Sequence, residues 1–217
     1  MKTLKESILS STSTGKFGII MSYIRKHSGK HYINPNGIDE TEKYIIDYAS
    51  LDDSGKLNIK YTSNRVVPLK IKDDQCTKLP IKLGDLGCPF ILKAPKLQSD
   101  EGLPDSVMSY FCCNDNEIVE VNHLPYIKSP WSGFLIFEIG GPKLRRIHCD
   151  YKGDIIRSNV GNAKLRIFVD TNMPKEELDL LMQDIQTHFE FRRVLKGKYT
   201  LEVRDYKTKT LYWSYKH

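Results

Sequence analysis

The sequence lacks the features that mark several protein classes. It has no run of about 18 apolar residues, so it predicts no membrane-spanning helix. Its opening, Met1–Glu6, has no apolar signal core, and secretion by that route is not expected. It contains only five cysteines, an odd number without regular spacing: Cys76, Cys88, Cys112, Cys113 and Cys149. This scarcity argues against a disulfide framework or zinc clamp and favours reduced thiols used as small apolar residues in a reducing compartment.

Catalytic and metal-binding signatures are also missing. Gly15-Lys16 lacks the upstream glycine and the following Ser or Thr of a phosphate-binding loop, and no predicted strand precedes it. The other suggestive sets are explained better as turns, apolar packing or a solvated basic patch: Asp52-Asp53, Asp73-Asp74, His27 with His31, and His148-Cys149-Asp150. We therefore predict no catalytic residue, no cofactor and no metal site.

The positive charge is concentrated at the two ends of the chain. The net charge is +6. Residues 1–31 carry six Lys/Arg against one acid, and residues 189–217 carry eight against three. The middle, 32–188, has 19 Lys/Arg and 23 acids. Such asymmetry is compatible with a polyanionic partner or with docking onto an acidic surface, but also with ordinary solubility, which we favour.

The first 37 residues predict a basic helical arm. The segment 3–27 reads as one or two helices broken near Ser10–Gly15. In its second half, an apolar face recurs at helical spacing: Phe17, Ile20, Tyr23 and Ile24. The turn Asn34–Gly37 separates the arm from the rest of the chain.

A β-rich segment comes next, and then a unit with a different pattern. Leu57, Ile59 and Tyr61 alternate with polar residues, as do Val67, Leu69 and Ile71. The last third predicts a strand at 164–170 and a helix with the stripe Leu178, Leu181, Met182, Ile185 and Phe189. Three more strands are predicted at 191–195, 199–204 and 210–215. We expect an α+β protein with three domains: residues 1–37, a β-rich domain 38–159, and a β-α-β-β-β unit 160–217.

Self-similarity is the most informative feature. Four positions recur 21 residues later: Phe90, Leu92, Leu97 and Leu103-Pro104 become Phe111, Cys113, Ile118 and Leu124-Pro125. The pattern places Phe111 and Cys113 on one face of a short strand, and Asn116 where its amide can bind the turning backbone. A weaker echo is predicted at Ile147 and Cys149, after an insertion around 131–142.

These residues resemble a known family. Residues 111–125, FCCNDNEIVEVNHLP, look like the F-x-C-x-x-N-x-L-x-x-L-x-G-L-P unit of divergent leucine-rich-repeat proteins of tailed bacteriophages and of bacteria that carry phage genes. Residues 1–11 and the turn at 32–37 are similar to the arm that precedes such repeats. The resemblance covers roughly 1–155. Pro95, Asp100 and His123 depart from the unit. The family implies a binding or structural role and supplies no catalytic residues.

We accordingly expect a non-enzymatic phage-associated protein, a virion component or a factor acting on a host protein in the cytoplasm, with no membrane association. The alternative is a nucleic-acid-binding protein that uses basic and aromatic residues of its C-terminal sheet. The predicted partner-binding residues are Trp131, Arg192, Arg193, Lys198, Tyr212 and Trp213. The sequence does not determine the oligomeric state.

Overall fold

The computed structural model describes residues 13–27, 48–61, 68–128, 135–148, 156–157, 163–190 and 199–216. Within these ranges the chain is an α/β protein with two α-helices and three mostly parallel sheets. The predicted α+β class is corrected in this respect. Strands that neighbour one another in a sheet are separated in the chain by segments that visit the other sheets, and this connection produces parallel pairing.

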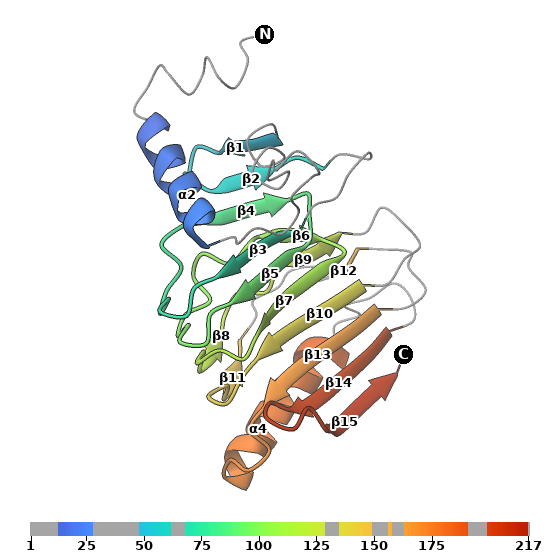
Figure 1. Cartoon of the computed structure of the whole chain (residues 1–217). Helices are drawn as coiled ribbons and strands as arrows, with labels where there is room; N and C mark the ends of the chain where they lie inside the picture. The colour runs from blue at the N-terminus through green and yellow to red at the C-terminus, as the bar shows by residue number, and fades with distance from the viewer. Residues whose placement is uncertain are drawn as a thin grey trace, which may run out of the picture.

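The largest sheet has seven strands and extends along the molecule (Figure 1). From one edge to the other its strands are β3 (Leu69–Lys72), β5 (Phe90–Lys93), β7 (Tyr110–Asn114), β10 (Leu135–Gly140), β13 (Ala163–Val169), β14 (Tyr199–Asp205) and β15 (Leu211–Lys216). All neighbours pair in parallel except β15, which pairs antiparallel to β14. Its strands thus follow one another in chain order.

A six-stranded and a two-stranded sheet complete the β structure. The former contains β1 (Ala49–Leu51), β2 (Leu57–Ile59), β4 (Leu83–Leu86), β6 (Ser106–Met108), β9 (Tyr126–Lys128) and β12 (Ile156–Arg157). The latter pairs β8 (Glu120–Val121) with β11 (Arg146–Ile147). The chain visits the sheets in turn, for example β7, β8, β9 and then β10.

One helix lies near each end of this arrangement (Figure 1). Helix α2 (Ser13–His27) buries Ile20, Met21 and Ile24, with Phe17 and Tyr23 packed against the same core, which confirms the predicted apolar face. Helix α4 (Lys175–Ile185) buries Leu178, Leu181 and Ile185, as predicted, and continues into the π-helical turn η1 (Gln186–Glu190). The carboxylate of Asp184 holds α4 on β11 because it accepts bonds from Arg146 Nε at 2.7 Å and Ile147 N at 3.1 Å.

The core of the seven-stranded sheet is built from two rows of inward side chains in register. The first row runs Leu69, Phe90, Phe111, Phe137, Leu165 and Leu201; the second runs Ile71, Leu92, Cys113, Ile139, Ile167 and Val203. Every member is 1% exposed or less. The rings of Phe90, Phe111 and Phe137 stack, with centroid distances of 6.1 and 5.1 Å. Alternation of inward and outward residues therefore fixes the register of the sheet.

This arrangement confirms part of the predicted self-similarity and corrects another part. Phe90 and Phe111 are direct partners on adjacent parallel strands, as predicted. The predicted echo at Ile147 is wrong. The partner of Phe111 on the next strand is Phe137, and Ile147 pairs with Val121 in the two-stranded sheet. The segment interpreted as an insertion contains β10, whose apolar alternation was overlooked.

The turns after the strands use the predicted polar chemistry. The Asn116 side chain is buried, donates to Cys113 O at 2.7 Å and accepts from Ile118 N at 3.0 Å. Asp100, which departs from the family pattern, is also buried, and its Oδ2 accepts from the backbone of Asn122 and His123. Gly102 has φ +91°, and a Cβ there would lie 2.5 Å from Ile81 O, so the close approach requires glycine.

The C-terminal segment contains the predicted strands 163–169, 199–205 and 211–216 and joins the main sheet directly. β13 pairs in register with β10, so the hydrogen-bonded sheet crosses the expected boundary between residues 159 and 160. Several predicted features lie outside the described residues: the helical segment 3–12, the turn Asn34–Gly37, the strand 191–195, and Cys149.

Candidate interaction surface

The outward face of the seven-stranded sheet gathers polar and half-buried apolar side chains from strands distant in sequence. Because successive strand residues point to opposite faces, the residues between the core positions point outward. The central outward row runs, in register, Lys70, Ile91, Cys112, Glu138, Arg166, Glu202 and Ser214. A parallel row runs Tyr110, Ile136, Lys164, Thr200 and Lys216. We call the surface formed by these two rows the outer face.

Alternating charges form a continuous ladder across three strands of the outer face. Arg166 donates from Nη1 to Glu138 at 2.8 Å and from Nε to Glu202 at 3.2 Å. Arg204 donates from Nε to Glu202 at 2.8 Å. The carboxylate side chains are only 12% exposed, and those of Arg166 and Arg204 are 27% exposed. The ladder therefore stiffens the face while leaving part of each guanidinium accessible to a partner.

The ladder keeps its groups ionised. Hydrogen bonding to Glu138 raises the pKa of Arg166. Burial alone would raise the pKa of Glu202, but hydrogen bonds and charge from Arg204 and Arg166 outweigh burial and lower it. Both guanidinium groups and the Glu202 carboxylate consequently stay charged at neutral pH, and the face presents fixed charges of both signs.

Cys112 lies beside this ladder but is unsuited to nucleophilic chemistry. Its Sγ is 3.5 Å from Glu138 Oε2, which also accepts from Asn114 Nδ2 at 3.1 Å and faces the Tyr110 hydroxyl at 3.5 Å. Burial raises the pKa of Cys112 to about 11 and also raises the pKa of Tyr110. The thiol is therefore protonated near neutral pH, whereas a reactive cysteine needs its pKa lowered.

The turn after β14 is anchored at the edge of the outer face. Lys209 Nζ lies 2.6 Å from Asp115 Oδ1, and the same ammonium sits 4.6 Å from the centre of the Phe168 ring. The Asp205 carboxylate organises the turn itself, accepting from Thr208 N at 2.7 Å and Thr171 Oγ1 at 2.9 Å. This connection fixes the β14–β15 hairpin relative to β7.

The structure describes two of the six predicted partner-binding residues, and they differ in environment. Tyr212 is 50% exposed on β15. Trp213 is partly buried, packs against the core and stacks on Tyr215 with ring centroids 6.4 Å apart. The other four, Trp131, Arg192, Arg193 and Lys198, lie outside the described residues.

The remaining sequence candidates take structural positions wherever they are described. Gly15 and Lys16 lie inside α2, which leaves no loop there to hold a phosphate. Asp52 accepts from Ser54 N, Ser54 Oγ and Lys56 N in the turn between β1 and β2, and these bonds lower its pKa to about 2. His31, Cys149 and Asp150 lie outside the described residues.

A second polar cluster ties α2 to the end of β3. The Tyr23 hydroxyl donates to Asp73 Oδ2 at 3.0 Å, and His27 Nδ1 lies 3.6 Å from the same oxygen and 3.2 Å from Lys72 O. Burial raises the pKa of the adjacent Cys76 thiol. A protonated thiol beside this His–Asp pair lacks an activated nucleophile, so the cluster is best understood as an attachment point.

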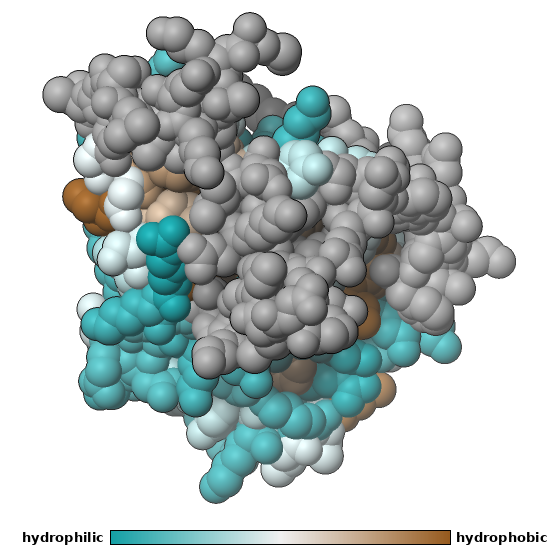
Figure 2. Space-filling model, turned by 45° about the horizontal axis from the view of Figure 1, so that its top comes forward, coloured by the Kyte–Doolittle hydropathy of each residue, from teal (hydrophilic) through white to brown (hydrophobic). Residues whose placement is uncertain are grey.

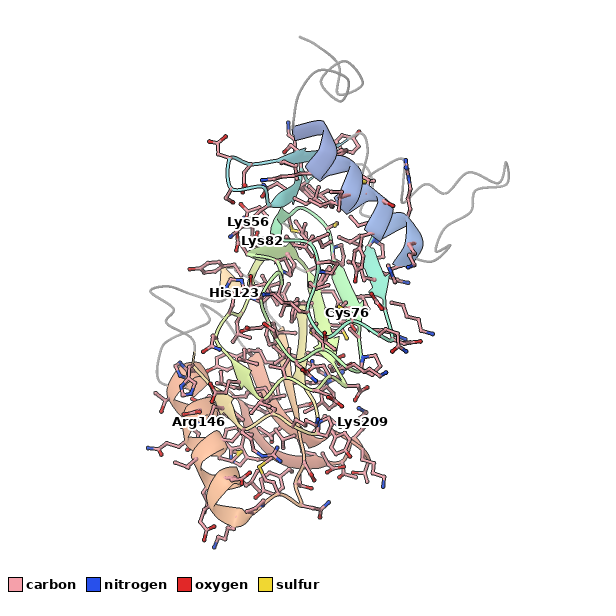
Figure 3. The ribbon with its side chains drawn as sticks, turned by 90° about the vertical axis from the view of Figure 1, so that its left-hand side faces the viewer. Lys56, Cys76, Lys82, His123, Arg146 and Lys209 are labelled. Atoms are coloured by element: carbon pink, nitrogen blue, oxygen red, sulfur yellow. The ribbon has the colours of Figure 1, made fainter. Side chains whose placement is uncertain are left out.

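A third cluster of charged residues lies on another side of the molecule. Figure 3 shows Lys56 and His123 on the same side of the ribbon. Lys56 Nζ lies 2.7 Å from Asp105 Oδ2, and His123 Nε2 lies 3.8 Å from Asp105 Oδ1. These contacts connect successive layers along the six-stranded sheet. In the view of Figure 2, hydrophilic side chains dominate the described surface and apolar ones form small separate patches.

Sequence reasoning missed the whole outer face. The signal was present in part: Leu69 and Ile71 precede Phe90 and Leu92 by 21 residues, the same spacing as the detected pair. The outward residues lie between these positions, so extending the repeat by one unit would have placed Lys70 beside Ile91. Glu138, Arg166 and Glu202 follow irregular spacings and become neighbours only through the register of the sheet.

Neither chemistry nor similarity assigns another site. Among the described residues, no group of three or more His, Cys, Asp or Glu side chains is placed to hold a metal ion. The described helices are too short or too polar to cross a membrane. No family model, curated protein or solved structure matches the chain.

Proposed function

We propose that the chain is a non-enzymatic, phage-associated module that binds another protein through its outer face, built on a leucine-rich-like repeat. The observation that carries this proposal is the register of the seven-stranded sheet, in which Leu69, Phe90, Phe111 and Phe137 occupy one row. A stack of equivalent strands needs each neighbour to cover its apolar side and presents a continuous surface on the other side.

The composition of the outer face favours a protein partner. Tyr110, Ile91 and Ile136 are half-buried and lie beside Arg166, and aromatic, aliphatic and arginine side chains of this kind are enriched at protein interfaces. The acids of the ladder are already paired, so a partner would not have to neutralise isolated buried charges.

Nucleic-acid binding through the C-terminal sheet is the weaker proposal. Two of its basic side chains are already engaged, Arg204 by Glu202 and Lys209 by Asp115. Of the two aromatics described there, only Tyr212 is largely exposed. If nucleic acid were the ligand, affinity would fall steeply as salt rises, and a filter-binding titration across ionic strength would reveal it.

The experiment that tests protein binding uses photo-crosslinking in cells that make the phage proteins. A crosslinking amino acid at Ile91 or Ile136, on the outer face, should capture the same partner. The matched control is Leu180, which is apolar, 49% exposed and located on α4 instead of the sheet. Capture of one partner from both outer-face positions but not from Leu180 supports the proposal; identical capture from all three positions refutes it.

A substitution provides the second arm. Ile136→Lys leaves the core unchanged because Ile136 points outward, and we expect it to reduce partner binding at least tenfold. Leu180→Lys adds the same charge on α4 and should leave binding unchanged. Mass spectrometry of purified particles then separates the two roles: recovery with the virion indicates a structural component, and recovery only from host cytoplasm indicates a host-directed factor.

A further inference from the structure

We propose that the chain forms a two-fold symmetric dimer in which the β15 strands of two copies pair antiparallel, edge to edge. β15 is the last strand of the seven-stranded sheet, and no described strand pairs with its second edge. Such an edge presents unpaired N–H and C=O groups and is a template for another strand.

The two edges of the sheet differ in how they are protected. At the β3 edge, α2 contacts the sheet through Tyr23 and His27. At the β15 edge, no described helix performs this function, and the strand itself, LYWSYK, has one charged residue, Lys216. Leu211 and Tyr212 are 52% and 50% exposed. Natural edge strands are usually guarded by several charges, proline or a covering element, and the described part of β15 has little of this protection.

The hydrogen-bonding pattern identifies which backbone groups face outward. Tyr206 N donates to Val169 O, so the even-numbered residues of β14 direct their backbone groups toward β13. The odd-numbered residues, including Leu201 and Val203, therefore face β15, where their partners are Tyr215 and Trp213. The N–H and C=O groups of Ser214 and Lys216 consequently point to the unpaired edge.

These groups define a self-complementary register centred on Ser214. In an antiparallel pair about this residue, Ser214 faces Ser214 of the second copy, and Lys216 faces Tyr212. Trp213 then lies across from Tyr215 on the inward face, where both rings are only partly buried in the single chain. Aromatic pairs of this kind stabilise adjacent strands.

Charge favours a second copy in this orientation. The antiparallel register places each Lys216 beside a tyrosine ring, a favourable cation–π arrangement. A parallel register would place Lys216 opposite Lys216, and like charges directly opposite each other are destabilising. The pairing would also join the two outer faces into one continuous surface, although it does not depend on what that surface binds.

The test measures association of the purified full chain by analytical ultracentrifugation from about 1 µM to about 1 mM, the range in which modest interfaces assemble. We expect a monomer–dimer equilibrium. Ser214→Lys should weaken it about a hundredfold because two ammonium groups would meet on the symmetry axis. Thr208→Lys, with the same charge in the adjacent turn, should not. A wild-type chain that stays monomeric throughout this range overturns the proposal.

Two further measurements locate the interface. Mixing Ser214→Lys with Ser214→Glu should restore dimers that contain one copy of each, because opposite charges then meet. Ser214→Cys should form an intermolecular disulfide under mild oxidation, and Thr208→Cys should not. Dimerisation that is unaffected by Ser214→Lys, or heterodimers that fail to form, would place any self-association elsewhere. Circular dichroism of each variant verifies that the sheet is intact.

Discussion

The stacked phenylalanines allow a quantitative test of the core. Phe111 lies between two rings, whereas Phe90 has one ring neighbour among the described residues. Both side chains are fully buried. Replacing Phe111 by alanine should cost about 3–5 kcal/mol of unfolding free energy, because a large cavity opens in a closely packed layer.

Leucine substitutions isolate the contribution of stacking. Phe111→Leu removes two ring contacts and Phe90→Leu removes one, and an aromatic pair contributes about 0.5–1.5 kcal/mol beyond burial. We therefore expect Phe111→Leu to be more destabilising than Phe90→Leu by about that amount. Urea unfolding followed by far-UV circular dichroism measures both variants, and an unchanged slope with denaturant shows that the comparison is valid.

A double-mutant cycle provides the control. Phe111 and Phe137 should couple by about 0.5–1.5 kcal/mol, whereas Phe90 and Phe137, which are separated by a strand, should be additive within about 0.5 kcal/mol. If Phe90→Leu costs as much as Phe111→Leu, or if the separated pair couples as strongly as the adjacent pair, the layered packing of these rings is incorrect.

Other predictions concern polar groups. Asn116→Ala should cost about 1–3 kcal/mol in urea unfolding, because it leaves buried backbone groups of Cys113 and Ile118 unpaired. The bond from Thr208 N lowers the pKa of Asp205, so the stability that this carboxylate supplies is present above the unfolded pKa of about 3.9 and is lost as pH falls toward the lower folded pKa. Asp205→Asn should flatten that acid-side decline; an unchanged slope would contradict it. Iodoacetamide at pH 8 should modify Cys112 only after denaturation, because its pKa is about 11, and peptide mapping that finds it in the native chain would disprove its burial. Tyr23→Phe should increase hydrogen exchange in residues 13–27 while β7 and β10 stay protected; equal protection in both variants would show that the bond to Asp73 is not the attachment.

Local patterns predicted those elements whose signal lies within a short stretch of chain. The stripe of α4 and the face of α2 repeat at helical spacing, and both were found with few errors. The adjacency of Phe90 and Phe111 was also predictable because two units of equal length preserve the same spacing. Asn116 followed from the same comparison, since a buried amide at a turn has few other uses.

Features that depend on unequal connections could not be predicted in this way. Phe137 lies 26 residues after Phe111 instead of 21, so the strand that contains it was assigned to an insertion. The parallel pairing of β13 with β14 was likewise invisible, because the intervening helix and loop lengthen the connection. The ladder of Glu138, Arg166 and Glu202 depends on both of these registers and therefore required the structure.

The chain-order arrangement of the main sheet has a consequence for biosynthesis. Each new parallel strand from β5 to β14 adds beside the one made before it, so no strand in this series must wait for a distant later segment to emerge from the ribosome. Growth can advance in the direction of translation, with the most recent strand serving as the template for the next. A nascent chain halted between β10 and β13 would already hold its earlier layers together, but it would expose a fresh apolar row and depend most on chaperones at that point.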